Sequence, residues 1–343
     1  MTSTSKRSES YLVVGGSGFL GSYIVKALLA RGETSVSVFD IVSRSFDGDV
    51  KLYVGDIASK EDVSNAIRKS GATSIFHTAS PVHDQDDYIH QKVNVQGTRV
   101  LLDAAIANKV TKFVYTSSTG VTYTADPLEG ADETLPIPTK GFDAYHSTKA
   151  KAEIMVLAAN NLEGLRTVAI RPCGMIGPED RQAIFRFSRS WKNRHVQMGD
   201  NKTLVDYVYV GNVADAHLLA ADKMDSPAVA GQAFIITNGD PWFFWDFARY
   251  VWNELDNTPP AKTMVIPRGL AMFFAILSEI WGWIMGKKPI FNRFSVIFAT
   301  THQWYNIDKA RKLLGYEPSV SLTEGVDLMV KVCRSVPHLN LSF

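Results

Sequence analysis

The first half of the chain alternates short apolar runs with longer segments in which apolar residues recur at helical spacing. The short runs are bounded by polar residues or glycine, a pattern that predicts buried strands. Regular strand–helix alternation predicts a parallel sheet covered on both faces, that is, an α/β fold of the Rossmann-type doubly wound class. The predicted strands are 11–14, 35–39, 51–54, 74–79, 112–116 and 166–171, and the predicted helices are 23–30, 60–70, 86–108 and 143–161.

This alternation breaks down after about residue 180, where the chain becomes more aromatic and irregular. We therefore predict a Rossmann domain over 1–180 and a smaller, mainly substrate-binding region over 181–343, with 205–240 partly returning to the first domain. Residues 1–9 are polar and lack the apolar core of a secretory signal, so they are predicted to be a disordered tail. Further elements are predicted at 181–193 (helical and basic), 205–210, 213–223 and 232–237.

A glycine-rich stretch, Val-Val-Gly-Gly-Ser-Gly-Phe-Leu-Gly, joins the first predicted strand to the first predicted helix. Gly16, Gly18 and Gly21 fit the pattern G-x-G-x-x-G, and Gly15 replaces Gly16 in the variant G-x-x-G-x-x-G. Such glycines permit a sharp turn, the approach of a pyrophosphate to the backbone and close packing of helix on strand. The helix N-terminus then offers free N–H groups to the phosphates. A glycine-rich surface turn is the alternative, but the strand–turn–helix context argues for a dinucleotide site.

Asp40 ends the second predicted strand, where an acid accepts hydrogen bonds from the ribose hydroxyls of an adenosine. Its charge disfavours the 2′-phosphate of NADP, so NAD is the expected cofactor. Arg44 follows in the same loop and could accept that phosphate, which keeps NADP as the alternative. Ligands of parallel sheets bind beyond the carboxyl ends of the strands. The residues predicted to line that edge are Gly15, Asp40, Asp56, Thr78, Ser118 and Pro172.

Tyr145 and Lys149 lie four residues apart near the start of a predicted helix and therefore share one helix face. A nearby cation, together with the positive charge of an oxidised nicotinamide, favours the phenolate form of a tyrosine. Lys149 can also bind the nicotinamide ribose, and Ser118 can hold a substrate oxygen. These three side chains indicate proton transfer coupled to hydride transfer, although a Tyr-x-x-x-Lys pair alone is more often plain helix surface. Asn94 is expected to bend its helix and hold a water near Lys149, with an ordinary helix-surface role as the alternative.

Composition excludes several other classes of protein. The chain has 343 residues, 45% of them hydrophobic, and a formal net charge of +1, so no nucleic-acid partner is expected. Two cysteines indicate a reducing compartment without a disulfide framework. The eight histidines lack metal-ligand spacing, and no metal site is predicted. Cys173 has no clear histidine partner and is interpreted as a packed small residue.

The most apolar stretch of the chain is 269–286, interrupted only by Ser278 and Glu279. Eighteen helical residues span about 27 Å, slightly less than a hydrocarbon core of about 30 Å. The central Glu279 makes a full span costly, and Trp281 and Trp283 suit a membrane interface. We expect this segment to lie on or dip into one leaflet, with a buried helix roofing the substrate pocket as the alternative.

Together these motifs resemble the extended short-chain dehydrogenase/reductase superfamily, and within it the 3β-hydroxysteroid dehydrogenase branch. The likeness covers nearly the whole chain and is greatest to the fungal enzymes of that branch that act on sterol 4α-carboxylates. The loop 41–50 is short for the branch. The motifs that carry the likeness are 14–21, 39–42, 56–57, 77–81, 94–97, 114–118, Tyr145 with Lys149, 171–172, 243–247, 308–318 and 324–325.

The resemblance implies oxidation of the 3β-hydroxyl of a 4α-carboxysterol to a ketone, with loss of carbon dioxide at C4, in sterol biosynthesis. Tyr145 would be the proton acceptor, Lys149 its partner and Ser118 the ligand of the substrate oxygen. The residues implied to contact the cofactor are Gly15, Gly16, Ser17, Gly18, Phe19, Leu20, Gly21, Asp40, Asp56, Ile57, Thr78, Ala79, Ser80, Tyr145, Lys149, Pro172, Cys173, Gly174 and Met175.

The resemblance also points to the endoplasmic reticulum membrane, with the catalytic domain on the cytosolic side. A homodimer and a complex with other enzymes of C4 demethylation are further expectations. The closest rival reading is a 3β-hydroxysteroid or triterpenoid dehydrogenase of secondary metabolism. A nucleotide-sugar epimerase or dehydratase would need a polar, basic pocket, to which Arg181, Arg186, Arg189 and Lys192 could contribute. A non-enzymatic dinucleotide sensor could dispense with Tyr145, Lys149 and Ser118, all of which are present.

Overall fold

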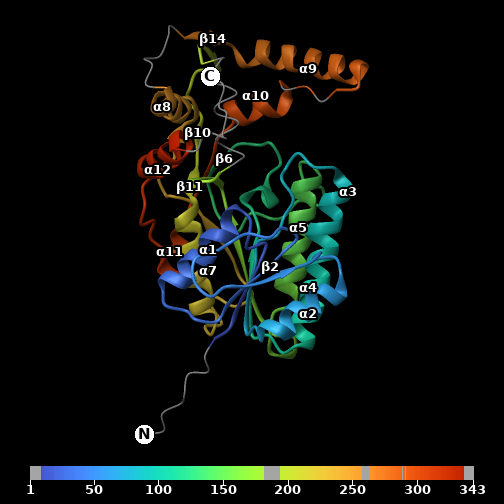
Figure 1. Cartoon of the computed structure of the whole chain (residues 1–343). Helices are drawn as coiled ribbons and strands as arrows, with labels where there is room; N and C mark the ends of the chain where they lie inside the picture. The colour runs from blue at the N-terminus through green and yellow to red at the C-terminus, as the bar shows by residue number, and fades with distance from the viewer. Residues whose placement is uncertain (1–8, 181–193, 257–262, 288, 290, 336–343) are drawn as a thin grey trace.

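The structure is a computed structural model that describes residues 9–180, 194–256, 263–287, 289 and 291–335. A sheet flanked by helices occupies one end of the molecule, and the elements from α8 (Phe244–Asp256) to α10 (Arg293–Thr300) gather at the other end (Figure 1). The helix predicted at 181–193 and residues 1–8 of the predicted tail lie outside the described residues. Glu9 belongs to the fold, contrary to our prediction, because its carboxylate accepts a hydrogen bond of 2.6 Å from Lys112 and one of 2.9 Å from Tyr11.

Seven parallel strands form the main sheet, in the order β12-β7-β5-β4-β1-β2-β3. The order reverses direction between β1 and β4, the topology that opens a ligand crevice at the carboxyl ends of the strands. This arrangement confirms the predicted doubly wound α/β class. The strands are β1 (Tyr11–Val14), β2 (Val36–Asp40), β3 (Lys51–Val54), β4 (Ser74–His77), β5 (Lys112–Thr116), β7 (Arg166–Pro172) and β12 (Ala233–Ile236).

Helices cover both faces of this sheet (Figure 1). One face packs against α1 (Phe19–Ala30), α7 (Val210–Lys223) and α11 (Asp308–Leu314), and the other against α2 (Lys60–Ser70), α4 (Thr98–Ala107) and α5 (Ala144–Ala158). The central strands are buried on both sides, which explains why they read as continuous apolar runs.

The segment predicted as a helix over 86–108 is helical from Asp87 to Ala107, which confirms the prediction, but its middle part is a π-helix. It consists of α3 (Asp87–His90), a π-helical segment (Gln91–Gly97) and α4. Inside the π-helical segment, Asn94 is buried, donates to Thr148 Oγ1 at 3.1 Å and accepts from Ser80 Oγ at 3.1 Å. Single-turn π segments recur at functional sites, and this one aims Asn94 at α5.

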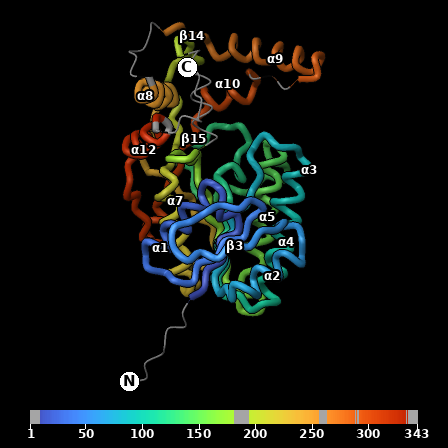
Figure 2. The backbone as a smooth tube through the Cα atoms, in the orientation of Figure 1, coloured from blue at the N-terminus to red at the C-terminus, as the bar shows by residue number. Residues whose placement is uncertain are grey.

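The second half of the chain contributes to both ends of the molecule. Figure 2 shows it passing from α7, beside the main sheet, to α8 and α9 at the far end. β12 pairs with β7 in the main sheet. The domain boundary itself stays a prediction.

The remaining strands are β6 (Leu128–Ala131), β8 (Gly174–Ile176), β9 (Val196–Met198), β10 (Leu204–Val205), β11 (Tyr207–Tyr209), β13 (Trp242–Phe243), β14 (Met264–Ile266) and β15 (Gln303–Tyr305), and the helices are α8 (Phe244–Asp256), α9 (Arg268–Met285), α10 (Arg293–Thr300) and α12 (Leu322–Ser335).

The apolar segment predicted at 269–286 forms α9, which packs on α10. Among the described residues it is the one helix long and apolar enough to cross a membrane, with a mean hydropathy of 1.3 and 17% of its residues buried. Only its small residues Ala271, Ala275 and Gly282 are buried. Most of its large apolar side chains face away from the protein.

Candidate active site

The glycine turn after β1 has the geometry of a dinucleotide cradle. Gly15 has φ +81°, in the left-handed region, and a Cβ there would lie 2.6 Å from the backbone nitrogen of Ala79. A Cβ on Gly21 would lie 2.2 Å from the carbonyl oxygen of Gly15. Both positions therefore require glycine, one for the turn and one for the contact of α1 with the turn. Gly18, by contrast, is exposed at the start of α1.

The first turn of α1 is free to bind an anion. Its N-cap, Gly18, offers no side-chain hydrogen bond, and no acidic residue occupies the first turn. Unpaired N–H groups and the positive end of the helix dipole remain available to phosphates. The glycine turn leaves room that a side chain would occupy, and the start of α1 is uncapped. Both features fit the pyrophosphate of a dinucleotide.

Asp40 lies beside this turn at the end of β2, as predicted. Its carboxylate accepts hydrogen bonds from the backbone nitrogens of Ser17 at 3.0 Å and of Val42 at 3.1 Å. These bonds fix the carboxylate next to the glycine turn, where it can accept the ribose hydroxyls. Arg44 turns its guanidinium to Glu179, which also pairs with Lys26 at 3.2 Å.

The other residues predicted to contact the cofactor follow the neighbouring strands. Thr78 donates its hydroxyl to Val14 O at 3.0 Å and so ties the end of β4 to β1. Asp56 pairs with Lys92 at 2.7 Å, and buried Ile57 lies against Gly97. Pro172 ends β7. The remaining predicted contacts adjoin these strand ends, namely Gly16, Phe19, Leu20, Ala79, Ser80, Cys173, Gly174 and Met175.

Tyr145 stands in the first turn of α5, whose N-cap Asp143 accepts a hydrogen bond of 2.9 Å from the backbone nitrogen of His146. Burial raises the pKa of Tyr145, and a hydrogen bond with the side chain of Ser118 lowers it. The structure thus brings together the two hydroxyl groups that the sequence predicted to share a substrate oxygen. Ser118 reaches this place because it directly follows β5 and caps the next short helix, Thr119–Thr122.

Lys149 lies one turn further along α5 and is 2% exposed. Burial lowers its pKa to about 7, whereas the negative charge of Glu153 acts in the opposite direction. Its ammonium donates to Thr116 O at 2.7 Å and lies 4.9 Å from the centre of the Tyr115 ring. The buried amine is therefore held at the carboxyl end of β5.

A buried ion pair that sequence reasoning missed anchors these catalytic elements to one another. Glu153 of α5, fully buried, accepts a bond of 2.9 Å from Arg171 Nε on β7. The same carboxylate accepts a bond of 2.5 Å from Ser117 Oγ. The pair thereby joins the helix of Tyr145, the end of β5 and the end of β7. The residues around Glu153 in the sequence give no indication that it pairs with Arg171.

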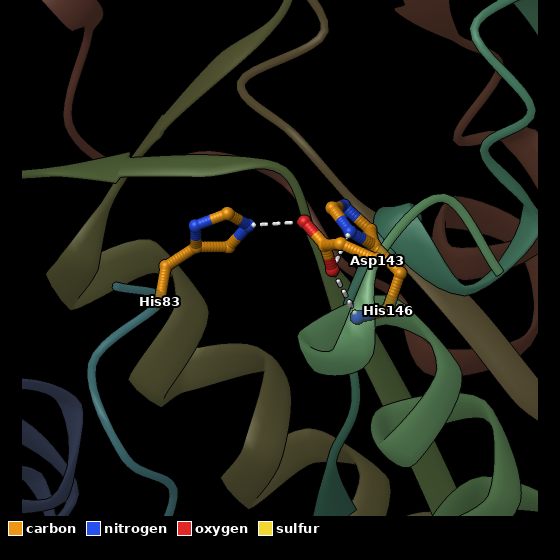
Figure 3. A group of neighbouring side chains, drawn as sticks. All are labelled: His83, Asp143 and His146. Atoms are coloured by element: carbon orange, nitrogen blue, oxygen red, sulfur yellow. Dashed lines mark hydrogen bonds and ion pairs between the residues drawn. The ribbon is translucent and has the colours of Figure 1, made fainter. Parts of the chain in front are cut away.

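Three imidazole rings surround Tyr145, and the sequence did not single them out. The ring centres of His83, His146 and His90 lie 5.0, 5.4 and 5.7 Å from that of Tyr145. Figure 3 shows the carboxylate of Asp143 between His83 and His146. The side chains of His83, Asp143 and His146 have potential metal-ligand atoms within 4.8 Å of one another, and among the described residues no other group of three does. The hydrogen bonds of Asp143 with His83 and with His146 already account for this spacing. That the protein has no metal site stays a prediction.

Aromatic residues connect this cluster to a cavity under α9. Phe294 of α10 stacks on His83 with ring centres 6.0 Å apart, and Phe142 lies 6.0 Å from His146. Both phenylalanines line a cavity of ≈ 550 Å³, together with Glu279 of α9 and Arg293 of α10. This hollow is open to solvent, and its lining mixes apolar side chains with the charged Glu279 and Arg293. Its lining residues thus come from the loop before α5, from α9 and from α10 with the residues before it.

Comparison with known proteins identifies the family of this chain. Residues 12–268 match the 3-beta hydroxysteroid dehydrogenase/isomerase family. The chain belongs to this family. It is 40% identical to the Saccharomyces cerevisiae protein named sterol-4-alpha-carboxylate 3-dehydrogenase, decarboxylating, over 93% of this chain and 96% of that protein. The human protein of the same name is 34% identical, over 95% of this chain and 88% of its own length. These findings confirm the family that the motifs indicated.

Solved structures show the same fold. The Thermus thermophilus UDP-glucose 4-epimerase in complex with NAD matches with a TM-score of 0.72 and 24% identity, over 95% of this chain and 99% of that chain. The Bordetella bronchiseptica enzyme WbmH in complex with NAD+ matches with a TM-score of 0.74 and 19% identity, over the same shares. At these identities the likeness concerns the fold alone.

Proposed function

We propose that this protein is an NAD-dependent oxidoreductase that oxidises the 3β-hydroxyl of a 4α-carboxysterol and releases the decarboxylated 3-ketone. The observation that carries the proposal is that Ser118 interacts with Tyr145, which shares a face of α5 with the buried Lys149. The names of relatives that match the chain over nearly its full length support the sterol carboxylate as substrate. The step belongs to sterol biosynthesis.

Each of the three side chains has a defined task in this reaction. Tyr145 takes the proton of the 3β-hydroxyl, Ser118 holds the same oxygen, and Lys149, one turn along α5, favours the phenolate by its positive charge. The turn from Gly15 to Gly21 and the carboxylate of Asp40 would hold NAD. When bound, the oxidised nicotinamide accepts the hydride released from C3. Asn94 is proposed to support α5 through Thr148 and to hold a water near Lys149.

Loss of carbon dioxide follows from the chemistry of the product. Oxidation at C3 converts the substrate into a β-keto acid. When the bond between C4 and the carboxylate breaks, the electron pair moves into the 3-ketone as an enolate, which then takes up a proton. The protein therefore needs only to hold the substrate and stabilise negative charge on the C3 oxygen, a task that suits Tyr145 and Ser118.

The decisive experiment is incubation of the full-length protein with NAD and a 4α-carboxysterol, followed by mass spectrometry of the sterol. We expect a ketone that has lost carbon dioxide, formed in equal amount with reduced cofactor. A preference for uncarboxylated triterpenoids would instead assign the enzyme to secondary metabolism. Turnover of a nucleotide sugar would support an epimerase, and cofactor binding without oxidation of any alcohol would support a sensor.

NAD is the proposed cofactor because of the groups around the expected ribose site. The Asp40 carboxylate is fixed by two backbone N–H groups, and Arg44 is paired with Glu179 rather than free to bind a phosphate. We expect Asp40→Ser to raise the KM for NAD roughly 10- to 100-fold, the effect of losing a hydrogen bond to a charged group. Steady-state kinetics with NAD and NADP measure it. Asp47→Ser, in the same loop but exposed, should leave the KM unchanged, and a wild-type preference for NADP would contradict the assignment.

Membrane contact through α9 is proposed from its exposed face. Glu279, at mid-helix, bonds to Arg293 of α10 at 2.7 Å, which fixes one side of α9 to the protein. A contiguous apolar face with tryptophans suits the interface of a bilayer, where the sterol substrate resides. We place the protein at the endoplasmic reticulum membrane, with its catalytic domain in the cytosol. The exposed apolar residues of α9 are Leu270, Phe273, Phe274, Ile276, Leu277, Ile280, Trp281, Trp283, Ile284 and Met285.

We expect the double substitution Trp281→Glu/Trp283→Glu to weaken binding to phosphatidylcholine vesicles by about 10²- to 10⁴-fold, because burial of each large apolar side chain contributes about 1.5–3 kcal/mol. Co-sedimentation with vesicles measures this effect. The matched control is Tyr88→Glu, which replaces an aromatic residue that is 70% exposed on α3. Unchanged vesicle binding in the double variant would instead assign α9 to roofing the pocket.

A homodimer and a complex with other enzymes of C4 demethylation remain proposals.

A further inference from the structure

His83, Asp143 and His146 form a hydrogen-bonded chain beside Tyr145 (Figure 3). His83 Nε2 lies 3.0 Å from Asp143 Oδ2, and His146 Nδ1 lies 2.7 Å from Asp143 Oδ1. Burial would raise the pKa of Asp143, but hydrogen bonds from His146 and His83 outweigh it and hold that pKa well below its usual range. Asp143 is therefore a fixed negative charge to which both rings donate an N–H group.

Of the three imidazoles around Tyr145, His83 is the one placed to meet a ligand. His90 is 1% exposed, and its Nε2 lies 3.3 Å from the carbonyl oxygen of His83. His146 is 8% exposed and packs against Gly120, where a Cβ would lie 2.3 Å from the ring. The side chain of His83 is 29% exposed, between the Tyr145 ring and Phe294 of the cavity wall.

The substrate of the proposed function sets a strict geometric demand. Its carboxylate is attached to C4, the carbon next to C3, so it must lie close to the oxygen that Tyr145 and Ser118 hold. Among the described residues, two other cations of this neighbourhood already have partners. Lys149 donates to Thr116 O, and Arg293 pairs with Glu279. Of the described side chains beside Tyr145, the partly exposed imidazole of His83 is placed to meet the carboxylate.

We propose that His83, oriented by Asp143, binds the 4α-carboxylate of the substrate and so selects carboxylated sterols. This inference rests on the proposed function. With Nε2–H donated to Asp143, the opposite nitrogen, Nδ1, is directed away from that carboxylate. His83 then lies between two carboxylates, one from the protein and one from the substrate, and each of its ring nitrogens faces one of them.

This arrangement also distinguishes substrate from product. The substrate is held at its C3 oxygen and at its carboxylate, whereas the product has lost the second group as carbon dioxide. The ketone therefore has no partner for His83 and binds more weakly than the acid. His83 selects and positions the substrate, while proton transfer belongs to Tyr145.

The test is His83→Phe, which keeps a ring against Tyr145 and Phe294 but removes both N–H groups. We expect the KM for a 4α-carboxysterol to rise roughly 10- to 100-fold, with kcat at saturation close to wild type. The inhibition constant of a 4α-methyl 3β-hydroxysterol, which lacks the carboxylate, should not change. Asp143→Asn, which retains an N-cap side chain, should shift the KM in the same direction. His195→Phe, an exposed histidine on the loop before β9, is the matched control.

Three results would overturn the assignment. An equal loss of affinity for carboxylated and uncarboxylated sterols would mean that His83 only packs against the pocket. An unchanged KM for the carboxysterol would remove it from binding altogether. Turnover that a chelator abolishes and zinc restores would assign the three side chains to a metal ion. Failure of the proposed function is a separate outcome, because the wild-type protein itself would then form no ketone from the carboxysterol.

Discussion

Replacing Tyr145 with phenylalanine should lower the rate of sterol oxidation by about 10²- to 10⁴-fold, the contribution of a positioned general base. The ring would remain packed among the three imidazoles, so the fold and the binding of NAD should be preserved. Only the oxygen that takes the proton is lost. Formation of reduced cofactor under saturating carboxysterol measures the rate, and quenching of protein fluorescence by NAD measures cofactor binding.

The pH dependence separates loss of a base from a general disturbance of the pocket. Burial raises the pKa of Tyr145, and Ser118 partly offsets that rise. The phenolate form of Tyr145 therefore becomes more populated as the pH rises, and wild-type oxidation should become faster. The residual activity of Tyr145→Phe should lack that rise. Tyr123→Phe applies the same chemical change to a tyrosine 6.1 Å from His146 and should retain near wild-type activity. A Tyr145→Phe enzyme with normal turnover would exclude Tyr145 as the proton acceptor.

The substitution Arg171→Met should lower the free energy of unfolding by about 3–5 kcal/mol, because it leaves Glu153 buried without its partner. A loss of this size is a large part of the total stability of a typical domain, about 5–15 kcal/mol. Since Glu153 also holds Ser117 and lies on the helix of Tyr145, the change should reduce activity as well. Urea unfolding followed by circular dichroism measures the stability.

A double variant tests the cause of that loss. Glu153→Leu combined with Arg171→Met removes both charges, and buried ion pairs replaced by apolar residues often retain their stability. We therefore expect the double variant to be more stable than Arg171→Met alone. If the two variants unfold at the same urea concentration, the loss comes from the missing arginine side chain rather than from an uncompensated charge.

The local sequence was sufficient wherever a structure depends on neighbouring residues. The helix predicted at 60–70 begins and ends as expected because Ser59 caps its start and Gly71, with φ +63°, ends it. The strands at 51–54 and 112–116 likewise have their predicted bounds. The glycine turn was predictable because its requirements for a sharp turn and close packing can be met only by glycine. Tyr145 and Lys149 were predictable as a pair because helical spacing fixes their common face.

The tertiary structure alone decided which distant residues meet at the site. The loop after β4 brings His83 to the N-cap of α5, and α10 brings Phe294 against the same ring, although no sequence pattern links these segments. The pairing of Glu153 with Arg171 likewise depends on α5 packing against β7. The sequence determined the α/β fold, the dinucleotide turn and the catalytic pair, because these follow from backbone geometry and spacing over short distances. The surroundings of that pair arise from packing between segments far apart in the chain, which local patterns do not encode.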